Sequence, residues 1–168
     1  SKYNINFKVG FAEDLPFENN KFDLIFFFNS LHHISPSMIK KALNEGKRVT
    51  KETGHMFIIE PLSVGTFNEI LKLVDDERNV RAKAYYEISD FNQNTLISNE
   101  EIFYDEKKEF NQFSELCNLL LSADPKRKNL IVKFNDKLIN KFNSLSKYTN
   151  NKYQFIQPMR MNIIKFNN

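Results

Sequence analysis

The chain has 168 residues, 41% hydrophobic and 27% charged, which is enough to bury the core of one ordinary soluble domain. Its formal net charge of +3 comes without a clustered basic run, which disfavours nucleic acid as a direct partner. No uninterrupted apolar stretch of about 18 residues occurs, so we expect no membrane span. The single cysteine, Cys117, excludes an internal disulfide and fits a reducing compartment, so we expect a cytoplasmic protein.

The first elements alternate between strand and helix signals. Asn6–Gly10 predicts a short strand, and the acidic turn AEDLPFENN follows with Pro16 as a breaker. Phe22–Phe28 is almost continuously apolar, which is typical of a strand covered on both faces and therefore favours a parallel sheet.

A helix and a second buried strand are expected next. Ser35 is a candidate N-cap with Pro36 at the first helical position, and Gly54 is a candidate C-terminal stop. His55–Pro61 then predicts a second buried strand. The order strand, turn, strand, helix, strand indicates the α/β class.

The remaining sequence predicts more helices and an outer strand. Helices are expected near Thr66–Asp75 and Glu77–Glu87, a charged outer strand over Glu101–Phe110, and a short helix over Phe113–Ala123. Apolar residues spaced by three and four then predict one amphipathic helix over Arg127–Leu145.

The C-terminal stretch YQFIQPMRMNIIKF alternates and predicts a terminal strand. We expect one of its faces to carry Phe155, Gln157, Met159, Met161 and Ile163. No internal repeat or linker interrupts the chain, so we expect one domain over residues 1–168.

Three stretches resemble a known family. GFAEDLPFENNKFDLIFFFNSLHHIS resembles the middle motifs of class I S-adenosylmethionine-dependent methyltransferases, in the small-molecule branch called type 11. ALNEGKRVTKETGHMFIIEPL resembles that branch's helix, turn and fifth strand, and QPMRMNIIK is similar to the last strand of some members. The resemblance implies a Rossmann-like α/β fold, S-adenosylmethionine as cofactor, and a small-molecule methyl acceptor.

The family's turn after its third strand implies cofactor-binding roles for Phe11, Ala12 and Glu13. That turn usually reads Asp-Ala-Glu, where the acid and the following N–H contact the adenine edge. Ala12 can keep the backbone contact, but Phe11 cannot accept a hydrogen bond from an adenine amino group. Stacking of Phe11 on a ring and packing of Phe11 in the core both remain open.

The loop after the family's fourth strand implies further roles. Asn29, Ser30, Leu31 and His32 correspond to residues that contact the methionine portion of the cofactor. His33 is the catalytic candidate, because an imidazole near the transferring methyl can orient or deprotonate an acceptor. The alternative for both histidines is a structural ring bonded to backbone.

Two other assignments come from the same region. Glu60 and Pro61 end the next strand and are candidates to line the acceptor pocket. No metal site is expected, because His32 and His33 diverge on an extended segment and no HxxE or CxxC partner is near.

The family's Gly-x-Gly-x-Gly turn and its first two strands have no counterpart here. The four glycines are Gly10, Gly46, Gly54 and Gly65, too far apart to form that turn. The family sheet has the order 3-2-1-4-5-7-6, so the fold is expected to be N-terminally incomplete, with strands three to seven. We expect cofactor-side motifs in residues 1–61, a helical region with one outer strand in 62–150, and the terminal strand in 151–168.

An incomplete sheet leaves its fourth strand with an open apolar edge. We therefore expect a truncated copy of a longer protein, with a homodimer that closes the edge. The alternative is that Asn6–Gly10 pairs directly with Phe22–Phe28. Two functions remain: the C-terminal portion of a small-molecule methyltransferase, or a non-catalytic methyltransferase-like module that binds a partner and not the cofactor. The sequence identifies neither the methyl acceptor nor whether this chain is an active enzyme.

Overall fold

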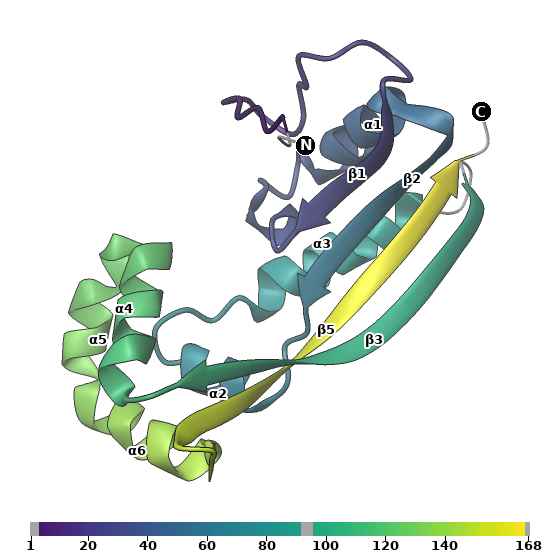
Figure 1. Ribbon diagram of the computed structural model, residues 1–168. Helices are drawn as coiled ribbons and strands as arrows, with labels where there is room; N and C mark the ends of the chain where they lie inside the picture. The colour runs from purple at the N-terminus through teal and green to yellow at the C-terminus, as the bar shows by residue number, and fades with distance from the viewer. Residues whose placement is uncertain (1–3, 92–95, 167–168) are drawn as a thin grey trace. The chain divides into compact units, whose positions relative to one another are not determined.

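A computed structural model describes residues 4–91 and 96–166 and contains one mixed sheet with flanking helices. The strand order is β1-β2-β5-β3, and β4 pairs with β5. In Figure 1 the arrows of β1 and β2 point the same way and the arrow of β5 points the opposite way. This order is the 4-5-7-6 portion of the expected family sheet. No described helix is long and apolar enough to cross a membrane.

The elements follow the chain as strands joined by helices. Their bounds are β1 Phe22–Phe28, the 3-10 helix η1 Leu31–His33, α1 Ile39–Val49, β2 Thr50–Pro61, α2 Thr66–Leu71, α3 Arg78–Phe91, β3 Leu96–Phe110, α4 Phe113–Ala123, the 3-10 helix η2 Pro125–Arg127, α5 Lys128–Lys133, α6 Asn135–Leu145, β4 Lys147–Thr149 and β5 Lys152–Phe166.

The chain divides into two compact units, each with its own core. The first comprises Ser1–Ile58, Lys83–Glu101 and Asn162–Asn168. Its core joins alternate residues of β1, β2 and β5 to the apolar faces of α1 and α3. The core residues are Phe27, Leu31, Ile39, Ala42, Leu43, Met56, Ile58, Ala84, Ile88, Phe91, Ile164 and Phe166.

The second unit comprises Ile59–Ala82 and Ile102–Met161. Its core packs α2, α4, α5 and α6 with residues of β3 and β5. The aromatic rings are close, with the Phe142 and Phe155 centroids 5.3 Å apart. The core residues are Phe67, Ile70, Val74, Phe110, Leu116, Leu120, Ile131, Leu138, Phe142 and Phe155.

The predicted strand Asn6–Gly10 is wrong, because the described residues 4–10 form neither helix nor strand. Its apolar side chains are exposed, with Phe7 93% and Val9 104% accessible. A short strand needs a hydrogen-bonded neighbour to form. The strands that would flank it in the family are not among the described residues.

The predicted start and end of the first long helix are also corrected. Met38 donates its N–H to the Ser35 carbonyl in a turn (2.7 Å), and α1 begins only at Ile39. At the other end β2 begins at Thr50, so Gly54 lies inside a strand. Glycine is needed at position 54 because of close packing and not as a helix stop: a Cβ there would lie 2.8 Å from the Asp23 carbonyl oxygen.

The single helix predicted over Arg127–Leu145 is broken at Phe134, which lies between α5 and α6 with φ −106° and ψ 15°. Phe134 still donates to the Leu130 carbonyl, and Leu138 donates to the Phe134 carbonyl. The break is therefore a local kink, and the apolar spacing continues through it because Ile131 and Leu138 enter the same core.

The terminal strand is confirmed, but its predicted buried face changes phase. Phe155, Gln157 and Met159 are buried as predicted, whereas Met161 and Ile163 are only half-buried. From Asn162 onward the even-numbered residues are buried. The change falls where β5 passes from the second unit to the first, so each half meets a different core.

Candidate functional site

The acidic turn before β1 is held on α1 by one ion pair. Arg48 binds both carboxylate oxygens of Glu45, at 2.7 and 2.8 Å. Its guanidinium also donates to the carbonyls of Leu15 (2.9 Å) and Phe17 (2.7 Å). Glu45 in turn accepts from the Leu15 N–H at 2.9 Å. The backbone of the turn is thereby fixed by three hydrogen bonds to these two side chains, even though it has no regular structure.

The ion pair lowers the pKa of Glu45 and raises that of Arg48. The Arg48 hydrogen bonds, helped by the Leu15 N–H, lower the pKa of Glu45 from 4.5 to about 2. Glu45 therefore stays ionised across the physiological range and keeps both acceptor oxygens available to the turn.

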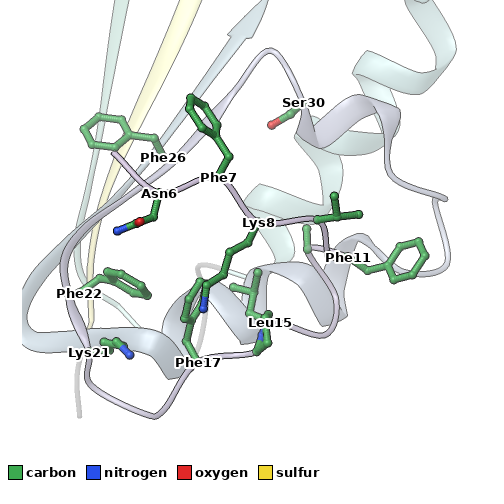
Figure 2. Close-up of a pocket in the computed structure, with 14 residues that line it drawn as sticks. Asn6, Phe7, Lys8, Phe11, Leu15, Phe17, Lys21, Phe22, Phe26 and Ser30 are labelled. Carbon is green, nitrogen blue, oxygen red and sulfur yellow. The ribbon is translucent and has the colours of Figure 1, made fainter. Parts of the chain in front are cut away.

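The residues of the turn and the outer face of β1 line an open pocket of about 990 Å³ within the first unit. That volume is at the upper end of small-molecule pockets. Five phenylalanines line it, Phe7, Phe11, Phe17, Phe22 and Phe26 (Figure 2). The Lys8 ammonium lies 5.0 Å from the centre of the Phe17 ring, so the pocket is aromatic with a positive charge at one side.

The predicted adenine-side residues occupy a tight turn at this pocket. Asp14 donates its N–H to the Phe11 carbonyl at 3.1 Å, which places Ala12 and Glu13 at the centre of the turn. Phe11 and Ala12 line the pocket, whereas Glu13 is half-buried and does not line it. The Phe11 ring is 72% exposed and lies apart from the rings of Phe17, Phe22 and Phe26 in Figure 2. It is therefore not a core residue.

The residues predicted to contact the methionine portion of the cofactor follow β1 and lie in different environments. Asn29 takes a left-handed backbone (φ 48°), and its side-chain oxygen is buried with no hydrogen-bond partner among the described residues. Ser30 lines the same pocket as Phe11 and Ala12. Leu31 is fully buried in the first core, so only its backbone is available to a ligand.

The two histidines differ in exposure. His32 is 4% exposed and His33 is exposed, although both lie in η1. Their ring centres are 4.0 Å apart. The backbone N–H of His33 donates to the Ser30 carbonyl at 3.1 Å. His33 is thus the ring of the pair that solvent reaches.

The outer face of β1 carries a row of exposed apolar side chains. Leu24, Phe26 and Phe28 are 51%, 56% and 60% exposed, and Phe26 stacks on Phe57 of β2 with ring centres 4.9 Å apart. Within the described residues β1 is at one end of the strand order, so one edge of its backbone has no strand partner there. A contiguous apolar row at a strand edge is typical of an interaction surface.

Sequence reasoning missed a second set of polar residues, in the second unit. Asn68, Arg81 and Gln157 are 5%, 9% and 3% exposed. Glu60, predicted to line an acceptor pocket, is buried as well at 3%. Buried polar side chains look the same in a sequence as exposed ones, so no local pattern distinguishes them.

The part of the chain that lines the pocket is also the part that is similar in sequence to known proteins. Residues 1–58 match the family described as "Methyltransferase domain". The "uncharacterized methyltransferase YcgJ" of Bacillus subtilis is 37% identical over 57 residues, which are 34% of this chain and 22% of YcgJ. The sequence match thus spans less than a quarter of that relative's length.

Solved structures of methyltransferases share the fold over nearly the whole chain. The crystal structure of YcgJ from Bacillus subtilis has a TM-score of 0.54 and 20% identity, covering 95% of this chain and 70% of that chain. A putative methyltransferase from Bacillus halodurans has a TM-score of 0.53 and 15% identity, covering 93% and 69%. The Rossmann-like class I methyltransferase fold is therefore confirmed.

Proposed function

We propose that the chain is the C-terminal portion of an S-adenosylmethionine-dependent methyltransferase that acts on a small molecule in the cytoplasm. The supporting observation is that Phe11, Ala12 and Ser30, from two sequence motifs separated by β1, line one pocket. The same stretch matches the methyltransferase domain family.

The residues present fit part of an adenosyl cofactor. The buried, unpaired Asn29 oxygen suits a donor such as the cofactor's ammonium group. The exposed Phe11 ring is available to stack on a purine, and the Ala12 backbone to contact its edge. The phosphate-loop-like glycine turn of the family is not among these 168 residues.

When bound, S-adenosylmethionine supplies an electrophilic methyl group. The contribution of this chain would then be mainly positioning. The left-handed Asn29 turns the backbone at the end of β1, and Arg48 holds the turn of residues 13–20 in place. His33 is exposed and can accept a proton from, or orient, an acceptor group.

The test is a titration with S-adenosylhomocysteine followed by amide NMR. We expect shifts at Ala12, Asn29 and Ser30 only at millimolar concentration, because the glycine turn is absent from this chain, and no calorimetric signal in the micromolar range. Adenosine should reproduce the shifts at Ala12 and not those at Asn29. An unchanged spectrum at the solubility limit of the ligand would contradict the proposal.

The second candidate is a methyltransferase-like module that binds a protein partner, including a second copy of itself. The observation that favours it is the exposed row Leu24, Phe26 and Phe28 along β1. It predicts association that depends on this row and not on the cofactor, which sedimentation velocity measures directly.

A further inference from the structure

In the second unit, the loop after β2 is fixed closely to β5. Leu62 donates its N–H to the Pro158 carbonyl at 2.8 Å, and Thr66 accepts from the Ile156 N–H at 2.9 Å. Gly65 has φ 95°, and a Cβ there would lie 2.3 Å from the Pro158 ring. The loop is therefore held against β5 by two hydrogen bonds and one close backbone approach.

Three buried polar side chains meet at this loop. The Leu62 carbonyl accepts from Arg81 Nη1 at 3.1 Å and from Gln157 Nε2 at 2.9 Å. Arg81 Nη1 also donates to Asn68 Oδ1 at 3.1 Å. These bonds fix both amide orientations, because the Asn68 oxygen and the Gln157 nitrogen face known partners.

One further polar atom of each of these three side chains has no hydrogen-bond partner among the described residues. Asn68 Nδ2, Arg81 Nε and Gln157 Oε1 are buried and make no hydrogen bond among the described residues. All three residues are more than nine-tenths buried. Buried polar atoms are nearly always paired, so three unpaired atoms in one network require an explanation.

The charges around this network are already balanced. Arg81 pairs with Glu77, and Arg127 pairs with Asp75 and lies 4.0 Å from Glu77. A further anion would therefore meet no unbalanced positive charge. It would also place a lone pair against the acceptor oxygen of Gln157.

We propose that Asn68, Arg81 and Gln157 form a recognition site for a neutral polar group that both accepts and donates hydrogen bonds. The unpaired set is two donors and one acceptor. A hydroxyl offers two lone pairs and one O–H, and a primary carboxamide offers a carbonyl oxygen and N–H donors. The ligand class is thus a small neutral alcohol or amide.

The site follows the end of β2, where Glu60 and Pro61 are the candidate residues of the acceptor pocket. Its role as the acceptor site of a methyltransferase rests on the proposed function. The binding of a neutral group does not, because it requires only residues of the second unit.

The experiment uses four probes of similar size: benzamide, benzyl alcohol, benzoate and toluene. The Arg81 Nε–H and Asn68 Nδ2 resonances are followed by side-chain ¹⁵N NMR on the whole chain. We expect saturable shifts with benzamide or benzyl alcohol in the millimolar range, and at least tenfold weaker effects of benzoate and toluene. No shift with either neutral probe, or benzoate binding as well as benzamide, would overturn the proposal.

An isosteric variant tests the donor. Asn68→Asp keeps the oxygen that accepts from Arg81 and replaces the unpaired donor with an acceptor, so benzamide should bind about tenfold more weakly. The control Asn140→Asp makes the same change at an exposed position of α6 and should bind as the wild type does. Equal affinity in all three proteins would refute the assignment.

A buried water could also satisfy these atoms. Cross-peaks from the Arg81 Nε–H to water that persist at the highest concentration of benzamide would show a structural water only, and would overturn the proposal. The wild-type titration needs no variant to fold. Its failure would leave the S-adenosylhomocysteine titration unaffected, so the two proposals fail separately.

Discussion

Replacing Glu45 with Gln is the sharpest test of how the turn at the pocket is held. The amide keeps an oxygen for the Leu15 N–H and removes the charge that pairs with Arg48. Glu45→Gln therefore isolates the ionic part of the anchor from its shape.

The size of the effect follows from the pKa of Glu45, which falls from 4.5 to about 2 in the folded protein. A depression of that size corresponds to about 3 kcal/mol for a fully shielded carboxylate. The Glu45 and Arg48 side chains are 18% and 32% exposed, so solvent screening reduces it. We expect Glu45→Gln to lower the free energy of unfolding by about 1 to 2 kcal/mol at pH 7.

The lowered pKa of Glu45 also predicts how the effect of Glu45→Gln on stability changes with pH. A carboxylate with a lowered folded-state pKa contributes its full stabilisation above its unfolded pKa of 4.5 and loses it as the pH falls toward 2. The gap in stability between the wild type and Glu45→Gln should therefore close between about pH 5 and pH 2.

The assay is urea unfolding followed by far-ultraviolet circular dichroism at a series of pH values. Glu52→Gln, at an exposed position of β2, is the matched control and should follow the wild type throughout. A Glu45→Gln variant as stable as the wild type at pH 7, or a gap that does not change with pH, would refute the reasoning.

Four further outcomes are expected. Leu138→Ala, at a fully buried core position, should cost about 2 to 5 kcal/mol in urea unfolding; a cost below about 1 would contradict the described packing. Gly65→Ala should destabilise by more than about 1 kcal/mol, because of its positive φ and the contact with Pro158, and a neutral effect would count against that loop. Phe26→Lys should abolish any concentration-dependent association of the wild type in sedimentation velocity; a wild type that stays monomeric at all concentrations removes the interaction hypothesis. Burial raises the pKa of the Cys117 thiol, so a chromogenic thiol reagent should react with it more slowly than with the urea-unfolded chain, and equal rates would show an open site.

Local apolar patterns predicted the elements that bury one continuous face. Phe22–Phe28 and Phe113–Ala123 form a strand and a helix with the predicted bounds, because every signal in those stretches agrees. The helix ends were less predictable. Ser35 was expected as an N-cap, but its hydroxyl lies 3.2 Å from the Ser37 hydroxyl and the helix begins three residues after Pro36.

The candidate site was likewise predicted from the sequence only in part. The sequence motifs predicted cofactor-binding roles for seven residues, and the structure places three of them, Phe11, Ala12 and Ser30, around one pocket. The ion pair that holds their turn could not be predicted, because Glu45 and Arg48 look like an ordinary pair on an exposed helix face. Only the fold brings the carbonyls of the turn within reach of the guanidinium.

What the sequence by itself determined was the α/β class and the type of most elements, because apolar periodicity is a local property. Tertiary structure alone decided the absence of the strand at Asn6–Gly10, the change of buried face along β5, and the burial of Asn68, Arg81 and Gln157. Each depends on what lies beside a residue in space. A strand forms only beside a neighbour, and a polar side chain is buried only where other elements enclose it.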